Sequence, residues 1–202
     1  MTQCTTCGPR YDPCNVPGLT KTGLQSSLSY AMTTKDNQIV AVRIADIVER
    51  PHAATDKKDA SDNTVESGIE YKKQTKKLSG KAKMIFDILN KLETKMWELI
   101  DTRIQRLFRI QILSVDRNFT RRGIARKLTE YNIEEAQRMG CEGVMVEATS
   151  FKTQNLFAEL GYQLICDINH KDWTTPDGNQ IFSCDDHHTT SSKLFYKPLP
   201  KL

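Results

Sequence analysis

The sequence predicts a single α/β domain in which a mixed sheet is flanked by helices. Three observations favour this fold class. The 202 residues are 38% hydrophobic, which suits one domain with a real core, and the chain shows no internal repeat. An amphipathic helical pattern occupies the middle of the chain, and β-type and helical patterns alternate after it. Elements of both kinds must bury their apolar faces against each other, so a layered domain follows.

The first predicted elements are the two strands of a β-hairpin. Residues 28–32 alternate apolar and polar side chains, and residues 39–48 are rich in β-branched residues. Asp36-Asn37 between them is typical of a turn, and Pro51 stops the second strand.

A polar stretch follows from residue 54 to residue 83, with almost no apolar periodicity and a group of lysines at 72, 73, 76 and 77. We interpret it as a mobile basic insertion. A nucleic-acid-binding patch is the alternative, but no aromatic residue apart from the adjacent Tyr71 accompanies these charges.

Residues 85–100 carry the i, i+3, i+4, i+7 spacing of one amphipathic helix. We assign its apolar stripe to the core, together with Trp97. The stripe consists of Ile85, Ile88, Leu89, Leu92, Met96, Leu99 and Ile100.

A strand, a turn and a cationic helix start then follow in immediate succession. Residues 110–115 suit a buried strand, residues 116–120 suit a turn, and a helix is expected from near Arg121 to Met139. The first N–H groups of a helix have no intrahelical partner and carry partial positive charge, and Gly123 lets a ligand approach the backbone. This pattern predicts a phosphate site. The chain has neither G-x-x-x-x-G-K-[ST] nor G-x-G-x-x-G, so the nucleoside triphosphate and dinucleotide signatures fail.

The remaining elements alternate in the same way. Gly140 is expected to end the helix, residues 144–146 read as a buried strand, and Ser150 can cap a second helix that closes at Gly161-Tyr162. A turn at residues 175–178 precedes a final strand near residues 194–196.

Two of these segments resemble motifs of the GNAT acetyltransferase superfamily. Residues 120–125, TRRGIA, are similar to the acyl-CoA motif [QR]-x-x-G-x-[GA], with Thr120 as a departure. Residues 147–162 resemble the second motif, N-x-x-A-x-x-[LF]-[YF]-x-x-x-G-[FY]. The E-A-T-S opening of that segment is similar to the invertebrate arylalkylamine N-acetyltransferases of the dopamine type.

The resemblance implies a mostly antiparallel mixed sheet and acetyl-CoA as co-substrate. The family's first strand is expected to be missing, because no room exists for it before Cys4. Leu113, Ser114 and Val115 would hold the thioester and the pantetheine arm through their backbone. The remaining expected coenzyme contacts are Arg121, Arg122, Gly123, Ile124, Ala125, Arg126, Gln154 and Phe157.

The implied reaction is acetyl transfer to a primary amine such as dopamine, octopamine or tyramine, by direct attack in a ternary complex. An alkylammonium has a pKa of about 10.4, so a base must remove its proton at neutral pH. Asp12-Pro13 stands where this branch has a glutamate in E-P-L, which makes Asp12 the expected base; a turn aspartate is the alternative. His187 and His188 are further candidates.

The acid that protonates the leaving thiolate is expected among hydroxyl groups. Many GNAT enzymes use a tyrosine where this chain has Phe157. The arylalkylamine branch uses serines instead, and Thr153 matches one of those positions with Ser150 close by. Both residues also suit plain helix caps.

Cysteine usage and hydropathy bound the other functions. Zinc ligands are offered only by joining the chain ends (Cys4, Cys7, Cys14, Cys184 and His187), so we predict no metal and reduced cysteines, with Cys141 and Cys166 as small buried side chains. The chain lacks a long apolar segment and an apolar signal core, and its net charge is +4. We therefore expect a cytoplasmic protein without membrane or nucleic-acid partners. The oligomeric state is not predicted.

Three alternatives to arylalkylamine acetylation stay open at this stage. The amine can instead belong to a polyamine or a protein lysine, because no sequence feature defines the amine pocket. The missing first strand and the aspartate in place of glutamate also fit a coenzyme A-binding protein that has lost catalysis. A zinc-tethered interaction module is the third.

Overall fold

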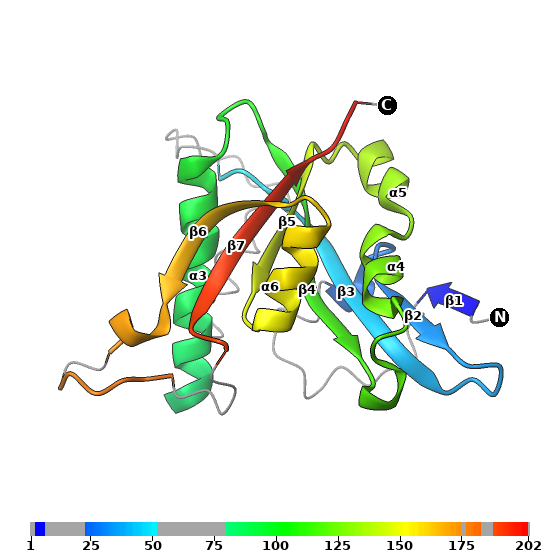
Figure 1. The fold of residues 1–202 in the computed structure, drawn as a ribbon. Helices are drawn as coiled ribbons and strands as arrows, with labels where there is room; N and C mark the ends of the chain where they lie inside the picture. Colours follow the sequence, from blue (N-terminus) through cyan, green and yellow to red (C-terminus); the bar gives the residue numbers. More distant parts are fainter. Residues whose placement is uncertain (1–2, 7–22, 52–79, 175–176, 183–187, 202) are drawn as a thin grey trace.

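The computed structural model describes residues 3–6, 23–51, 80–174, 177–182 and 188–201. Seven strands form one sheet in the order β1-β2-β3-β4-β5-β7-β6 (Figure 1). Neighbouring strands are antiparallel except β4 and β5, which run parallel. The predicted mixed, mostly antiparallel α/β domain is confirmed. The strands are β1 Gln3–Thr6, β2 Tyr30–Thr33, β3 Ile39–Glu49, β4 Arg106–Val115, β5 Gly143–Ala148, β6 Gln163–Asn169 and β7 Ser191–Pro198.

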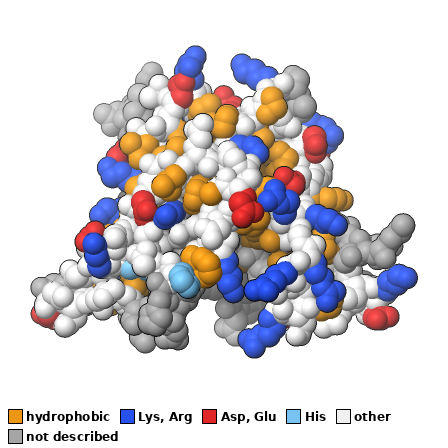
Figure 2. Space-filling view, in the orientation of Figure 1, with side chains coloured by type: hydrophobic (Ala, Val, Ile, Leu, Met, Phe, Trp, Pro, Cys, Tyr) orange, Lys and Arg blue, Asp and Glu red, His pale blue; other side chains and the backbone are white. Residues whose placement is uncertain are grey.

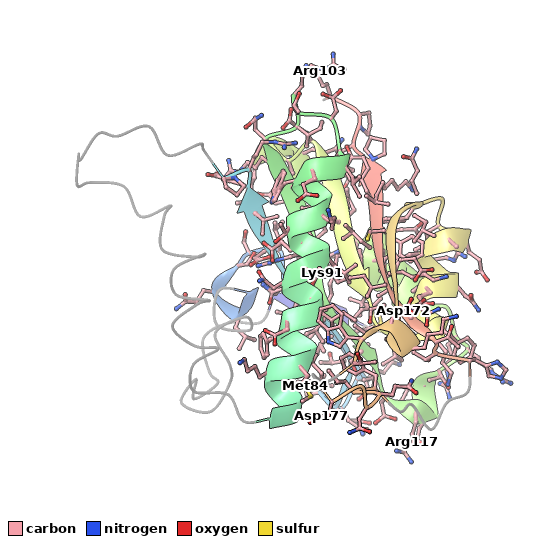
Figure 3. The ribbon with its side chains drawn as sticks, turned by 90° about the vertical axis from the view of Figure 1, so that its left-hand side faces the viewer. Met84, Lys91, Arg103, Arg117, Asp172 and Asp177 are labelled. Atoms are coloured by element: carbon pink, nitrogen blue, oxygen red, sulfur yellow. The ribbon has the colours of Figure 1, made fainter. Side chains whose placement is uncertain are left out.

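Helices cover both faces of the sheet. The helix α3 (Gly80–Leu99) crosses one face, as Figure 3 shows, whereas α4 (Ile124–Glu130), α5 (Ile133–Arg138) and α6 (Phe151–Glu159) lie on the other. Short 3₁₀ turns occur at Arg117–Phe119 and His170–Asp172. The side chains on the two faces form separate cores: one joins α5 and α6 to β4, β5 and β7, and the second joins α3 to β4, β5 and β7.

The predicted stripe of α3 is the face that it buries. Ile88, Leu92 and Met96 are almost fully buried, whereas Ile85 and Leu99 at the two ends of the stripe are 47% and 55% exposed, against expectation. Trp97 is half-buried, and the guanidinium of Arg50 lies 4.8 Å from its ring centroid. The expected insertion ends earlier than residue 83, because α3 already begins at Gly80; the part up to residue 79 lies outside the described residues.

The helix expected from Arg121 to Met139 is in fact two helices. It begins three residues later, at Ile124, and it is interrupted at Tyr131 and Asn132, where Asn132 takes a left-handed conformation (φ 50°). The interruption is compatible with burial because the fully buried Arg43 replaces the lost helical donors. Its Nη1 donates to the carbonyl oxygens of Leu128 (2.7 Å), Thr129 (3.3 Å) and Tyr131 (2.8 Å).

The expectation that the first strand is missing is wrong, because a strand, β1, lies at the edge of the sheet beside β2. The four residues of β1 pair antiparallel with β2, with Gln3 opposite Thr33 and Thr6 opposite Tyr30. A strand this short is enough to pair the backbone groups along β2, which is itself only four residues long. The N-terminal segment predicted as irregular over residues 1–24 therefore contains a strand.

Candidate active site

The central feature of the sheet is a fork between β4 and β5. The two strands pair only where residues 107–110 face residues 143–146. Beyond Ile110, β4 continues through Val115 with β3 as its one ladder partner in the described part of the chain. The backbone groups on the β5 side of that half therefore face the opening of the fork.

A β-bulge explains why the strands separate at this point. The pairing of β3 with β4 passes from Ile44–Ile112 to Ala45–Ile110, so Gln111 is an extra residue on β4. A bulge bends its strand and increases the local twist, which carries the second half of β4 away from β5.

The bulge also exchanges the two faces of β4. Before it, Phe108 and Ile110 point into the core beneath α5 and α6; after it, Leu113 and Val115 pack on that side, next to α4. Ile112 and Ser114 therefore point to the α3 face, where Ile112 is 37% exposed and Ser114 is exposed as well. Both faces of the fork are accessible as a result.

A cavity of about 490 Å³ lies where α4, α6 and the end of β4 meet. Six of the expected coenzyme contacts line it, namely Val115, Arg121, Gly123, Ile124, Ala125 and Arg126. Sequence reasoning missed Phe119 and the α6 residues Lys152, Asn155, Leu156 and Glu159. The α6 residues recur at i, i+3, i+4 and i+7, so helical periodicity alone could have placed them on one face.

The loop before α4 has the geometry of an anion site. Arg121 (φ 60°) and Gly123 (φ 70°) both take left-handed conformations that turn the backbone at the start of the helix. A Cβ on Gly123 would meet no atom within 4 Å, so the backbone there faces open space. Exposed cations surround it: Arg117, Arg121, Arg122, Arg126 and Lys127. Figure 2 shows Lys and Arg side chains gathered over α4 and this loop, beside a hollow in the lower part of that face.

Two of these arginines are held by neighbours. The Arg122 guanidinium lies 4.9 Å from the Phe119 ring centroid and donates to the carbonyl of Asn118 at 3.2 Å. Arg122 does not line the cavity, although we expected it to contact the coenzyme. Arg126 pairs with Glu159 at 3.2 Å across the gap between α4 and α6.

Gln154 and Phe157 lie on the buried side of α6 rather than in the cavity. Phe157 is fully buried, with its ring 5.0 Å from that of Tyr162. Gln154 Nε2 donates to the carbonyls of Ala148 (3.2 Å) and Ser191 (2.8 Å). Gln154 therefore links the end of β5 to β7 and so holds one side of the fork in place. Its buried position does not support the expected contact with the coenzyme.

The predicted acid residues begin α6 beside the fork. Ser150 Oγ accepts from the backbone N–H of Thr153, and the two hydroxyls hydrogen-bond to each other. Thr153 Oγ1 also contacts the carbonyl of Ser150 at 3.1 Å. Both half-buried hydroxyls thus cap the helix, and the geometry leaves their catalytic role a prediction.

The other predicted groups are placed as follows. Asp12 and His187 lie outside the described residues, as do three of the cysteines considered for zinc. Of those cysteines, only Cys4 is described, and it lies on β1. His188 is exposed, with its ring 5.2 Å from that of Phe151. Within the described ranges no cluster of three His, Cys, Asp or Glu forms a metal site. Burial raises the pKa of Cys141 to about 11, in keeping with a small core side chain.

The α3 face of the fork carries buried charges that sequence reasoning did not single out. Arg109 on β4 forms two hydrogen bonds to Asp46 on β3, at 2.9 and 2.8 Å, and a third to Glu93 on α3 at 3.0 Å. Burial opposes the guanidinium charge, but the bonds to Asp46 prevail and raise the pKa of Arg109. Among the described residues, no helix is long and apolar enough to cross a membrane.

Comparison with known proteins agrees with this geometry. Residues 96–162 match the family described as Acetyltransferase (GNAT) family. The match contains β4, the loop, α4 to α6 and β5, which are the elements that form the fork and its cavity. The chain therefore has the fold of the GNAT acetyltransferases, and the matched third of it carries that family's sequence pattern.

Solved structures extend the similarity over most of the chain. Arylalkylamine N-acetyltransferase 2 from Aedes aegypti is 25% identical, with a TM-score of 0.70 over 89% of this chain and 76% of that chain. A polyamine N-acetyltransferase from Drosophila melanogaster is 19% identical, with a TM-score of 0.71 over 95% and 84%. An agmatine N-acetyltransferase is 20% identical, with a TM-score of 0.70 over 89% and 78%. No curated protein sequence matches the chain.

Proposed function

We propose that this protein transfers the acetyl group of acetyl-CoA to the primary amine of a small arylalkylamine such as dopamine, octopamine or tyramine. The observation that carries the proposal is the fork between β4 and β5, which opens beside a cationic loop and a cavity of about 490 Å³. The Aedes aegypti arylalkylamine enzyme has the same fold at 25% identity, and the E-A-T-S segment resembles that branch.

In this proposal the coenzyme and the acceptor amine occupy opposite faces of the fork. The diphosphate of coenzyme A would lie on the loop around Gly123, where free N–H groups and exposed arginines provide positive charge. The pantetheine arm would follow the edge of β4 that has left β5. A backbone N–H of the bulged half would then hold the thioester oxygen as negative charge develops on it.

The acceptor would approach from the α3 face, because the cavity for the coenzyme opens on the face of α4 and α6. Its nitrogen attacks the carbonyl carbon directly, so coenzyme and amine must be bound together. The carboxylates of Asp46 and Glu93 lie on this side. They favour a cationic acceptor, and for this reason a polyamine or agmatine is the second candidate substrate.

The proposal is tested by incubating the purified chain with acetyl-CoA and a panel of amines while free thiol release is followed. The panel should contain dopamine, octopamine, tyramine, agmatine and spermidine, and calorimetry should measure coenzyme A binding in parallel. Thiol release with the aromatic amines supports the proposal, and release with agmatine or spermidine alone moves it to the second candidate. Coenzyme binding without release for any amine would leave a binding protein without catalysis.

A further inference from the structure

Glu147 is the next residue of β5 after its last pair with β4, so it stands at the point where the fork opens. Its neighbours Val146 and Ala148 belong to the core beneath α6, whereas Met145 belongs to the core beneath α3. By the alternation of a strand, Glu147 points to the α3 face. That is the face on which Ile112 and Ser114 are exposed beyond the bulge.

The carboxyl group of Glu147 receives none of the hydrogen bonds that the described charged and polar side chains on this face donate. Arg109 directs its three bonds to Asp46 and Glu93, and Gln111 Nε2 donates to Asp46 Oδ2 at 2.6 Å. Glu147 Oε1 is buried and has no hydrogen-bond partner among the described residues, although the residue as a whole is partly exposed. A buried carboxylate oxygen in this state is suited to a cationic donor that arrives from outside.

The surroundings make this carboxyl a stronger base than an ordinary glutamate. Burial raises the pKa of Glu147 to about 8, the charges of Glu93 on α3 and Asp46 on β3 act in the same direction, and Arg109 on β4 partly offsets them. On β7 its partner in the ladder is the apolar Leu194. A base with a pKa close to the pH of the reaction is well matched to proton transfer.

We propose that Glu147 is the catalytic residue that receives the ammonium group of the acceptor and removes its proton. This inference rests on the proposed acetyl transfer and names the residue that serves its acceptor. The ammonium gives one proton to the Glu147 carboxylate, and the freed nitrogen lone pair forms the bond to the thioester carbonyl carbon. As the C–S bond breaks, the second proton of the nitrogen passes to the departing thiolate, and Glu147 releases its proton to water.

Glu147 and Asp12 are alternative assignments of the base. The assignment of Asp12 rests on its sequence context, whereas Glu147 stands at the fork on β5 beside three charged neighbours from separate elements. The two assignments make different predictions for single variants. The base is the residue whose loss removes the rise of activity with pH near pH 8.

The test compares wild type, Glu147→Gln, Asp12→Asn and the surface control Glu134→Gln, with tyramine and spermidine as acceptors from pH 6.5 to pH 10. Loss of a positioned base lowers the rate by a factor on the order of 100, so the amine kcat/KM of Glu147→Gln should fall about 100-fold at pH 7.5. Its activity should then rise only toward the amine's own pKa of about 10. Glu134→Gln and coenzyme A affinity measured by calorimetry should stay at wild-type values, and Asp12→Asn should keep the rise near pH 8.

The outcomes separate this inference from the proposed function. An active wild type beside a Glu147→Gln variant with unchanged rate and pH profile overturns the role of Glu147 alone, as does a rise near pH 8 that disappears only in Asp12→Asn. A wild type that acetylates no amine overturns both. If Glu147→Gln does not fold, Glu147→Asp takes its place: a lower rate with a shifted rise supports the proposal, and a wild-type rate and profile contradict it.

Discussion

The two halves of β4 have nearly the same apolar composition but differ in strand pairing and in burial. Residues 106–110 lie between β3 and β5, and Leu107, Phe108 and Ile110 are almost fully buried. Residues 111–115 keep the pairing with β3 only, and their side chains are half-buried or exposed. One strand therefore supplies core packing at its start and an accessible backbone edge at its end.

One extra residue, Gln111, separates the core half of β4 from the half with the accessible edge. Gln111 changes which residues point to each face, and it does so where β4 leaves its parallel neighbour. The groups to which we assign functions lie on both sides of the opening: the cationic loop on the α4 side and the carboxyl of Glu147 on the α3 side.

The greatest change in stability is expected when one apolar residue from each half of β4 is truncated to alanine. Phe108→Ala removes a fully buried ring that also lies 5.1 Å from the Arg43 guanidinium, so it should lower the free energy of unfolding by about 3–5 kcal/mol. Ile112→Ala removes a side chain that is 37% exposed and should cost about 1 kcal/mol. Urea denaturation of both variants measures the contrast. Equal losses would show that the two halves are packed alike.

The next effect concerns the carboxyl at the opening of the fork. The pKa of Glu147 rises from its ordinary 4.5 to about 8 in the folded chain, so between these values the folded state holds a proton that the unfolded chain has lost. Stability therefore falls as pH rises through this window. Glu147→Gln mimics the protonated form, and its advantage over wild type should grow from near zero at pH 4.5 to on the order of 4 kcal/mol at pH 8.5. Thermal or urea unfolding at both pH values measures it; a pH-independent difference would contradict the raised pKa.

These elements also show how far the sequence alone reaches. The hairpin, α3, the helix caps and the loop at Gly123 follow from local patterns, because periodicity and turn residues act over a few positions. The break at Asn132 could not be predicted in the same way. The carbonyl groups that lose their helical donors at this break accept hydrogen bonds from Arg43, which lies 85 to 88 residues away in the sequence.

The candidate site divides along the same line. The contacts on the loop follow from a motif, whereas the importance of Glu147 depends on Asp46, Glu93 and Arg109, which three other elements bring to it. The bulge at Gln111 is hidden as well, because both halves of β4 read as apolar strand. Long-range pairing decides these features, and no local pattern records it.

A third prediction concerns the cationic side of the fork and uses two glycines of equal strain. Gly123 (φ 70°) and Gly161 (φ 76°) both have open space where a Cβ would lie, but only Gly123 lines the cavity. Valine at either position should cost similar stability, because a β-branched residue disfavours positive φ. Gly123→Val should also weaken coenzyme A binding at least about tenfold, or roughly 1.4 kcal/mol, while Gly161→Val should not. Calorimetric titration of both folded variants decides; equal affinities would remove the loop from the coenzyme site.

The smallest expected effect comes from a charge at the edge of the same cavity. Lys152 on α6 is exposed and lines the cavity, whereas the control Lys35 is an exposed lysine of the hairpin turn. An exposed cation near a phosphate contributes up to about 1 kcal/mol, so Lys152→Gln should weaken coenzyme A binding about fivefold at low salt. At 1 M salt, where the Debye length is about 3 Å, screening should make the coenzyme A affinities of wild type and Lys152→Gln equal. Because Gly123 acts through backbone approach and Lys152 through charge, the loss in Gly123→Val should survive high salt while that in Lys152→Gln disappears. A salt-independent loss in Lys152→Gln would mean that its methylene chain packs against the coenzyme instead.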